Sequence, residues 1–167
     1  MKASFGTLLR GFNATLQGMV KRRKKKQAKP EIKAYRCKTA PLSGHRFVDI
    51  MPQARRVFRT LQKQTKRRPY VRSEYFHKDK IFFDFFWQHM QQKLPSDRAR
   101  RLIYFPCALE VLRNSRHDPE TYIDIRSPGI IKHRFVGITP GGQRFGVVIH
   151  EDRKTNKKQL LTIYALH

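Results

Sequence analysis

The uneven distribution of positive charge is the feature that most restricts how this chain can fold. Its 167 residues include 37 Lys and Arg against 12 Asp and Glu, a formal net charge of +25. Residues 1–80 hold 23 basic and 4 acidic residues, whereas residues 81–167 hold 14 and 8. Repulsion among the positive charges of residues 1–80 opposes a compact state unless a counter-charge is bound. The sequence therefore predicts a basic arm, 1–74, and a globular domain, 75–167.

The charge also predicts a polyanionic partner. Each Lys or Arg that neutralises a phosphate releases condensed counterions, so RNA (rRNA, tRNA or mRNA) is the expected partner. An anionic membrane surface is the main competing polyanion. No apolar run approaches the roughly 20 residues that a membrane span needs. No membrane span is therefore expected.

The cysteines and the N-terminus bear on the compartment. Cys37 and Cys107 fit no metal-ligand spacing, and two isolated cysteines are typical of a reduced, cytoplasmic protein. The first acidic residue is Glu31, and hydroxyl residues precede it. This composition is also that of a mitochondrial transit peptide, so a mitochondrial location stays open.

Cationic side chains of the arm gather in two places. Residues 21–26 (KRRKKK) repel one another at helical spacing, so this run is expected to be extended until it meets a polyanion. Residues 29–46 are predicted to be an extended linker, and residues 52–68 a basic helix that opens at Pro52. The residues expected to bind RNA, including two from the domain, are Lys21, Arg22, Arg23, Lys24, Lys25, Lys26, Arg55, Arg56, Arg59, Lys66, Arg67, Arg68, Lys132 and Arg144.

The second half is predicted to be α+β, with N-terminal helices followed by a four-stranded antiparallel sheet and preceded by the basic, largely extended arm. Hydrophobic patterns indicate helices over 78–93, 97–105 and 107–114, with Ser96 as an N-cap. Alternating residues indicate strands over 121–126, 130–138, 143–151 and 159–165. Pro128–Gly129 and residues 139–142 are turn signals.

One face of this sheet is expected to carry chemistry. Residues of one parity share a face, so Lys132 lies beside Arg134, and Thr162 beside Tyr164 if Leu161 and Ile163 are core. Arginine matches phosphate oxygens, and histidine exchanges protons near neutral pH. No zinc spacing or phosphate-binding glycine loop appears, so neither a metal nor a cofactor is expected.

Simpler explanations stay open for each of these residues. A solvated outer face accounts equally well for Lys132 and Arg134. His89 also fits a core or helix-end histidine, and His150 an ordinary surface residue. His133 is expected to point toward the core or toward a hydrogen-bond partner.

Four segments of residues 78–167 carry a family resemblance: FFDFFWQHM with His89, RLIYFPCALEVLRN, KHRFVGITPGGQRFGVVIHE and QLLTIYAL. In their order along the chain they resemble the superfamily that groups barnase, EndoU, colicin and RelE-like nucleases (BECR), of phage or bacterial toxin type. The resemblance implies a metal-independent endoribonuclease that cleaves by 2′-OH attack and leaves a 2′,3′-cyclic phosphate. It further implies that His89 exchanges protons, Arg134 holds the phosphate, and Thr162 and Tyr164 orient it or donate to it. An inhibitor protein is a further possible partner.

Two other functions compete with cleavage. A ribosomal or mitochondrial ribosomal protein, whose basic arm threads through rRNA among other ribosomal proteins, would show the same charge density. A DNA-binding accessory protein is supported by the predicted basic helix at 52–68. The ribosomal alternative predicts that no polar cluster converges on the sheet.

Overall fold

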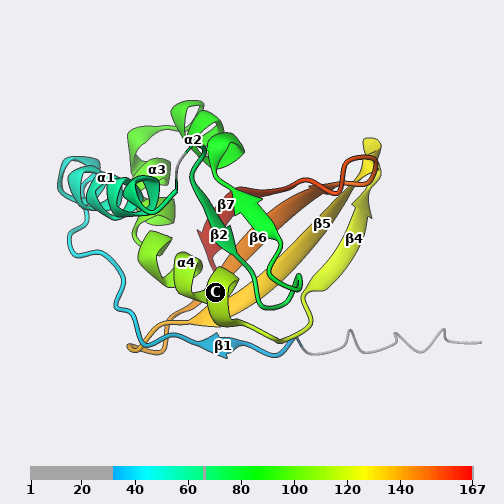
Figure 1. The fold of residues 1–167 in the computed structure, drawn as a ribbon. Helices are drawn as coiled ribbons and strands as arrows, with labels where there is room; N and C mark the ends of the chain where they lie inside the picture. The colour runs from blue at the N-terminus through cyan, green and yellow to red at the C-terminus, as the bar shows by residue number, and fades with distance from the viewer. Residues whose placement is uncertain (1–31, 66, 167) are drawn as a thin grey trace, which may run out of the picture. The chain divides into compact units, whose positions relative to one another are not determined.

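The computed structural model describes residues 32–65 and 67–166. The cationic run 21–26 and Lys66, both predicted to bind RNA, lie outside the described residues. The described part contains, in chain order, β1 (Tyr35–Arg36), α1 (Phe47–Lys63), β2 (Tyr70–Arg72), β3 (Lys80–Phe82), α2 (Asp84–Gln91), α3 (Pro95–Leu102), α4 (Phe105–Asn114), β4 (Glu120–Asp124), β5 (Ser127–Ile138), β6 (Arg144–Asp152) and β7 (Lys158–Ala165) (Figure 1).

The sheet corrects the predicted fold. It has seven strands with mixed pairing and bends into a half-barrel, so the expected four-stranded antiparallel sheet is wrong. The strand order is β1-β5-β6-β7-β3-β2, and β4 also pairs with β5. Neighbours among β4–β7 are antiparallel, as predicted, whereas β1 is parallel to β5 and β3 is parallel to β7.

The three additional strands are too short to leave a periodic pattern. β1 has two residues and lies in the predicted linker, and β3 has three residues and lies in the predicted helix 78–93. An apolar run suits a buried strand as well as a buried helix, so periodicity does not separate them. With β2 and the 17-residue α1, these elements belong to one compact unit, residues 31–167. The arm is therefore not largely extended over its described residues.

Two helix boundaries also differ from the prediction. α1 begins at Phe47 and holds Pro52 inside it, although proline usually opens a helix or disrupts its interior. α3 begins at Pro95 with Leu94 as its N-cap, so Ser96 is not the cap. Proline at the first helical position has no N–H to satisfy, which explains why the helix starts there.

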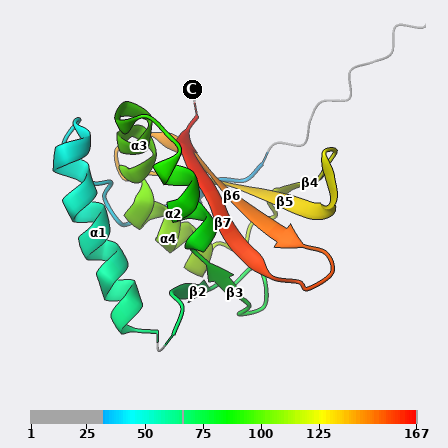
Figure 2. The ribbon, with the colours of Figure 1, turned by 90° about the horizontal axis from the view of Figure 1, so that it is seen from above.

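The helices form two layers on one side of the sheet. Figure 2 shows α1 as the outer layer, with α2, α3 and α4 between it and the strands. Phe86 and Phe105 are fully buried and stack with their ring centroids 5.5 Å apart. Phe145, Val147 and Ile149 of β6 are buried in this core.

A β-bulge changes the predicted core face of β7. The register shifts between Val148 and Ile149, so Leu160 pairs with Ile149 and is fully buried. Ile163 is buried as expected, but Leu161 is only half-buried because it is the extra residue of the bulge. Thr162 and Tyr164 keep the outward face that the sequence predicts.

Glu110 of α4 fixes the segment around β1. Its carboxylate accepts hydrogen bonds from the backbone N–H of Lys38 (2.9 Å), the backbone N–H of Thr39 (2.7 Å) and the hydroxyl of Tyr35 (3.3 Å). Burial acts to raise the pKa of this carboxyl, but the hydrogen bonds outweigh burial and lower the pKa below its usual value. The ionised carboxylate therefore stabilises the folded state.

Replacing Glu110 by Gln is expected to destabilise the protein by about 1–2 kcal/mol at pH 7, because hydrogen bonds to a charged acceptor are stronger than those to an amide. A depressed folded-state pKa contributes stability above the unfolded pKa of about 4.3, and this contribution is lost as pH falls through the folded pKa. Urea unfolding should therefore show a gap between the two proteins at pH 7 that narrows below about pH 4. A gap that does not depend on pH would contradict this role.

Candidate functional site

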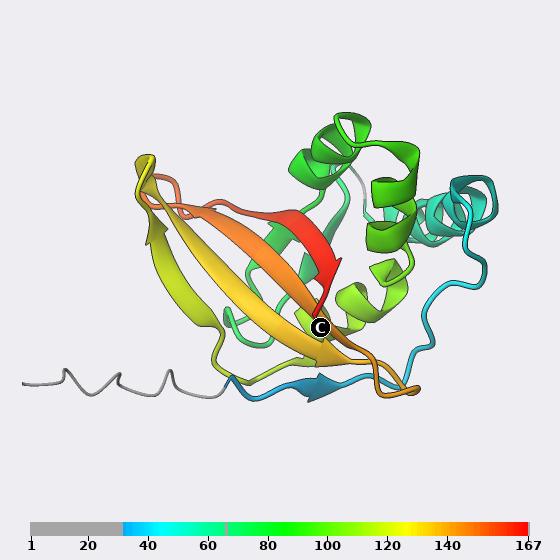
Figure 3. The same ribbon diagram turned by 180° about the vertical axis from the view of Figure 1, so that it is seen from behind.

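The helices leave one face of β4–β7 uncovered, and we call it the open face (Figure 3). Polar side chains converge on this face. Strand register aligns them in rows, because paired residues of neighbouring strands point to the same side. One row runs Tyr122, Lys132, His150, Gln159, and the next runs Glu120, Arg134, Val148, Thr162. We use the name open-face cluster for Arg101, Glu120, Lys132, Arg134, His150, Thr162 and Tyr164.

Arg134 lies at the centre of the open-face cluster. Its guanidinium forms an ion pair with Glu120 on β4. A hydrogen bond with the Tyr164 side chain is the main factor that raises the pKa of Arg134, with a smaller contribution from Glu120. The structure therefore brings together Arg134 and Tyr164, two of the residues that the sequence selects.

Gly146 allows Tyr164 to reach Arg134. A Cβ atom added at Gly146 would lie 2.7 Å from Cζ of Tyr164 and 3.0 Å from its hydroxyl oxygen. Gly146 pairs with Tyr164 on one side and with Val136 on the other. The tyrosine ring thus lies across β6 in space that a side chain would fill, and its hydroxyl is directed toward β5.

Gly146→Ala is expected to displace Tyr164 and break its contact with Arg134. The half-buried ring can shift, so we expect a stability loss of about 1 kcal/mol. If cleavage depends on this contact, the rate should fall about tenfold, the equivalent of one lost hydrogen bond. Gly129→Ala is the control, because nothing lies within 4 Å of its added Cβ. Equal RNA cleavage by both variants would show that the position of Tyr164 does not matter.

Thr162 is held by Arg101 of α3 rather than by Arg134. The Arg101 guanidinium donates to Oγ1 of Thr162 at 2.6 Å and to the carbonyl of Ile163 at 3.3 Å. Sequence reasoning missed Arg101, which follows Arg98 and Arg100 in one helix turn. These three arginines differ in the side of α3 on which they lie. The sequence does not show which side faces β7, so it could not single out Arg101.

His89 of α2 lies close enough to Arg101 of the open-face cluster for the Arg101 charge to act on it. It follows Phe85 by one helical turn, so both share a face of α2, and the Phe85 ring contacts the His150 ring with centroids 5.5 Å apart. Burial lowers the pKa of His89, and Lys93 and Arg101 lower it further. His89 is therefore neutral at pH 7 and able to accept a proton.

His150 is the other histidine of this region, and its sequence pattern also fits an ordinary surface residue. Its neighbour in the row is Lys132, whose ammonium pairs with Asp124 at 2.7 Å. Burial is the largest factor that lowers the pKa of His150, and Lys132 lowers it further, while Asp124 and Asp152 act in the opposite direction. His133, in contrast, is buried on the helix-covered face, as expected.

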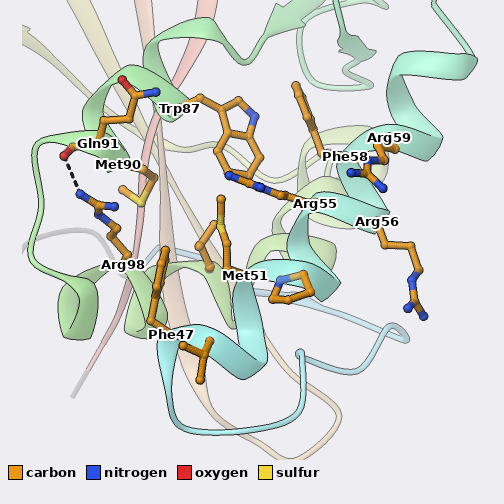
Figure 4. Close-up of a pocket in the computed structure, with 13 residues that line it drawn as sticks. Phe47, Met51, Arg55, Arg56, Phe58, Arg59, Trp87, Met90, Gln91 and Arg98 are labelled. Carbon is orange, nitrogen blue, oxygen red and sulfur yellow. Dashed lines mark hydrogen bonds between the residues drawn. The ribbon is translucent and has the colours of Figure 1, made fainter.

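Several residues predicted to bind RNA lie elsewhere. Arg55, Arg56 and Arg59 of α1 line a groove of about 880 Å³ between α1, α2 and α3 (Figure 4). Its remaining lining is mostly apolar and contains no His, Asp, Glu or Lys: Phe47, Val48, Met51, Pro52, Phe58, Trp87, Met90, Gln91, Arg98 and Leu102. The groove therefore has the composition of a binding surface and lacks groups for proton transfer.

The other predicted cations are dispersed. Arg67 is exposed, and Arg68 pairs with Asp84 at the start of α2. Arg144 is exposed at the first residue of β6, opposite Ile138. Lys132 belongs to the open-face cluster.

None of the protein-family models, curated proteins or solved structures with which the chain was compared matches it. Within residues 32–65 and 67–166, no helix is long and apolar enough to cross a membrane. The resemblance to the nuclease superfamily stays a prediction.

Proposed function

We propose that this chain binds RNA and cleaves it at the open face as a metal-independent endoribonuclease. The observation that carries the proposal is the convergence of Arg134, Tyr164 and Thr162 on one sheet face, with neutral histidines beside them. Metal-independent cleavage needs a proton acceptor, a proton donor and a cation at the phosphate. The open face, together with His89 of the adjacent helix α2, contains candidates for each of these groups.

The chemistry assigns a role to each side chain. A neutral histidine removes the proton of the 2′-OH, and the oxygen attacks the adjacent phosphorus. Arg134 and Arg101 stabilise the negative charge that grows on the phosphorane oxygens, and Tyr164 orients the phosphate. A protonated histidine gives its proton to the departing 5′-oxygen, which leaves a 2′,3′-cyclic phosphate. His89 and His150 are the two groups proposed for these proton transfers.

A structural role in a ribosome is the alternative function. It accounts for the net charge of +25, but it requires no convergence of acid/base side chains on the sheet. The open-face cluster is the feature that favours catalysis over this alternative. RNA binding is common to both proposals.

The test is cleavage of labelled RNA by the purified full chain in EDTA. His89→Ala and His150→Ala should each lower the rate about 100-fold or more, because general acid–base catalysis contributes that much. His45→Ala is the control. His45 is exposed in the segment before α1, and this variant should cleave RNA at the rate of the wild type. No cleavage by the wild type, or equal rates for all four proteins, would overturn the proposal.

The pH optimum of cleavage is expected to lie below about 6.5. Catalysis needs one neutral and one protonated histidine, and the pKa values of His89 and His150 both lie below the ordinary value of 6.5. The fraction of molecules with one proton on the pair is therefore greatest in mildly acidic solution. A profile of kcat/KM against pH should be bell-shaped with its maximum there, whereas an optimum above pH 7.5 would contradict the assignment.

A further inference from the structure

The outer face of the β2–β3 hairpin presents two aromatic rings. Tyr70 and Phe82 are directly paired in the antiparallel register, and their ring centroids lie 6.1 Å apart. Val71 and Ile81, on the opposite face of the same strands, are buried in the core. Tyr70 and Phe82 are only half-buried, so they face outward.

Four cations surround these rings. Lys80 and Arg72 lie 4.8 and 5.7 Å from the Tyr70 centroid. Arg68 and Lys157 lie 4.9 and 5.8 Å from the Phe82 centroid. We call these six residues the aromatic–cationic patch.

The charge of the patch is largely uncompensated. Arg68 pairs with Asp84, but within the described part of the chain no carboxylate forms an ion pair with Arg72, Lys80 or Lys157. Like charges gathered around one hairpin repel one another, and a bound polyanion would relieve this repulsion. Rings interleaved with cations are the composition that proteins use to bind single-stranded nucleic acid.

The patch lies in the same row of the sheet as the candidate site. Phe82 pairs with Gln159 of β7, Gln159 pairs with His150 of β6, and His150 pairs with Lys132 of β5. Paired residues share a face, and β3 is two strand spacings from β6, a distance of about 10 Å. Phe85, which is 38% exposed and follows Phe82 closely in sequence, contacts the His150 ring of the open-face cluster.

We propose that the aromatic–cationic patch binds a single-stranded RNA segment next to the phosphate that the open face cleaves. Bases stack on Tyr70 and Phe82, and the four cations hold the phosphates. Duplex RNA hides the faces of its bases, so the rings select unpaired RNA. This inference rests on the proposed function for its link to cleavage, but binding can be measured separately.

The test uses fluorescence anisotropy of the full chain with labelled 2′-O-methyl RNA, which cannot be cleaved by 2′-OH attack. Single-stranded and duplex forms of one sequence are compared. The double variant Tyr70→Leu/Phe82→Leu should bind the single strand at least tenfold more weakly and the duplex nearly as well as the wild type does, because stacking contributes to unpaired bases only. The double variant Tyr70→Phe/Phe82→Tyr keeps both rings and should bind the single strand about as tightly as the wild type does.

A second pair of variants separates the patch from general charge. Lys80→Gln/Lys157→Gln should weaken binding and reduce the slope of log K against log salt by about 1–2. Arg100→Gln/Arg113→Gln removes the same charge from exposed helix positions and should have a smaller effect. Binding to a polyglutamate peptide is measured as a comparison with another polyanion. The inference would be overturned if the variant without both rings kept its affinity for single-stranded RNA. It would also be overturned if loss of the rings weakened binding to polyglutamate and not to RNA.

The same proteins are assayed for cleavage of unmodified RNA. Cleavage by the wild type, together with unchanged binding by the Tyr70→Leu/Phe82→Leu variant, would overturn this inference and leave the proposed function standing. Ring-dependent binding by a wild type that does not cleave would overturn the proposed function and support the patch as an RNA site.

Discussion

Replacing Arg134 by Ala is expected to lower kcat for RNA cleavage by about 100- to 1000-fold, the usual effect of removing one donor that stabilises transition-state charge. Arg134 contacts Glu120 and Tyr164, so its guanidinium is held in place before substrate binds. Arg134→Lys keeps the charge but loses the planar fork that matches phosphate oxygens. We therefore expect Arg134→Lys to recover only part of the rate.

Single-turnover kinetics on labelled RNA measures these rates. Arg144→Ala is the matched control, because Arg144 is an exposed arginine at the first residue of β6. Its loss should change KM modestly and leave kcat within about threefold of the wild type, since a phosphate contact outside the reaction contributes to binding only. If Arg134→Ala and Arg144→Ala behave alike, Arg134 has no special role in cleavage.

Replacing Lys158 by Met is expected to lower the free energy of unfolding by about 3 kcal/mol, the largest loss among the proposed substitutions. Lys158 is 5% exposed on the helix-covered face, and its ammonium contacts Asp79 at 2.9 Å and Glu151 at 3.3 Å. Glu151 in turn contacts His133 at 2.7 Å. Methionine would leave the half-buried Glu151 carboxylate with His133 but without the ammonium, and the exposed Asp79 would stay solvated.

Urea unfolding measures this loss, and two further variants interpret it. Lys154→Met, at an exposed loop position, should change stability by less than about 0.5 kcal/mol. Lys158→Met/Glu151→Gln should be at least about 1 kcal/mol more stable than Lys158→Met, because it removes the uncompensated charge. A loss for Lys158→Met no larger than that for Lys154→Met would mean that the ion pairs of Lys158 do not stabilise the fold.

The sequence predicted the parts of the fold that have strong local periodicity. The strands β4–β7 occur close to their predicted places, since alternating β-branched residues mark half-buried strands. The half-barrel was missed because β1, β2 and β3 are held by long-range pairing and by tethers such as Glu110, which is 72 residues from Lys38. Such contacts leave no local pattern.

The candidate site was predictable to a similar extent. Parity along strands placed Arg134, Thr162 and Tyr164 on one face, and the structure brings Arg134 and Tyr164 into contact. Arg101 was missed because its role depends on how α3 packs against β7. The importance of Gly146 was missed because it depends on a ring from the neighbouring strand.

The central claim, cleavage of RNA by 2′-OH attack at the open face, is tested most directly with an oligodeoxynucleotide that contains one ribonucleotide. Incubation with the full chain in EDTA should cut only after that ribonucleotide and leave a 2′,3′-cyclic phosphate, detected by mass spectrometry, and Arg134→Ala should cut about 100-fold more slowly. An intact oligonucleotide, cleavage at deoxynucleotides, or a product with a linear 5′-phosphate would contradict the claim.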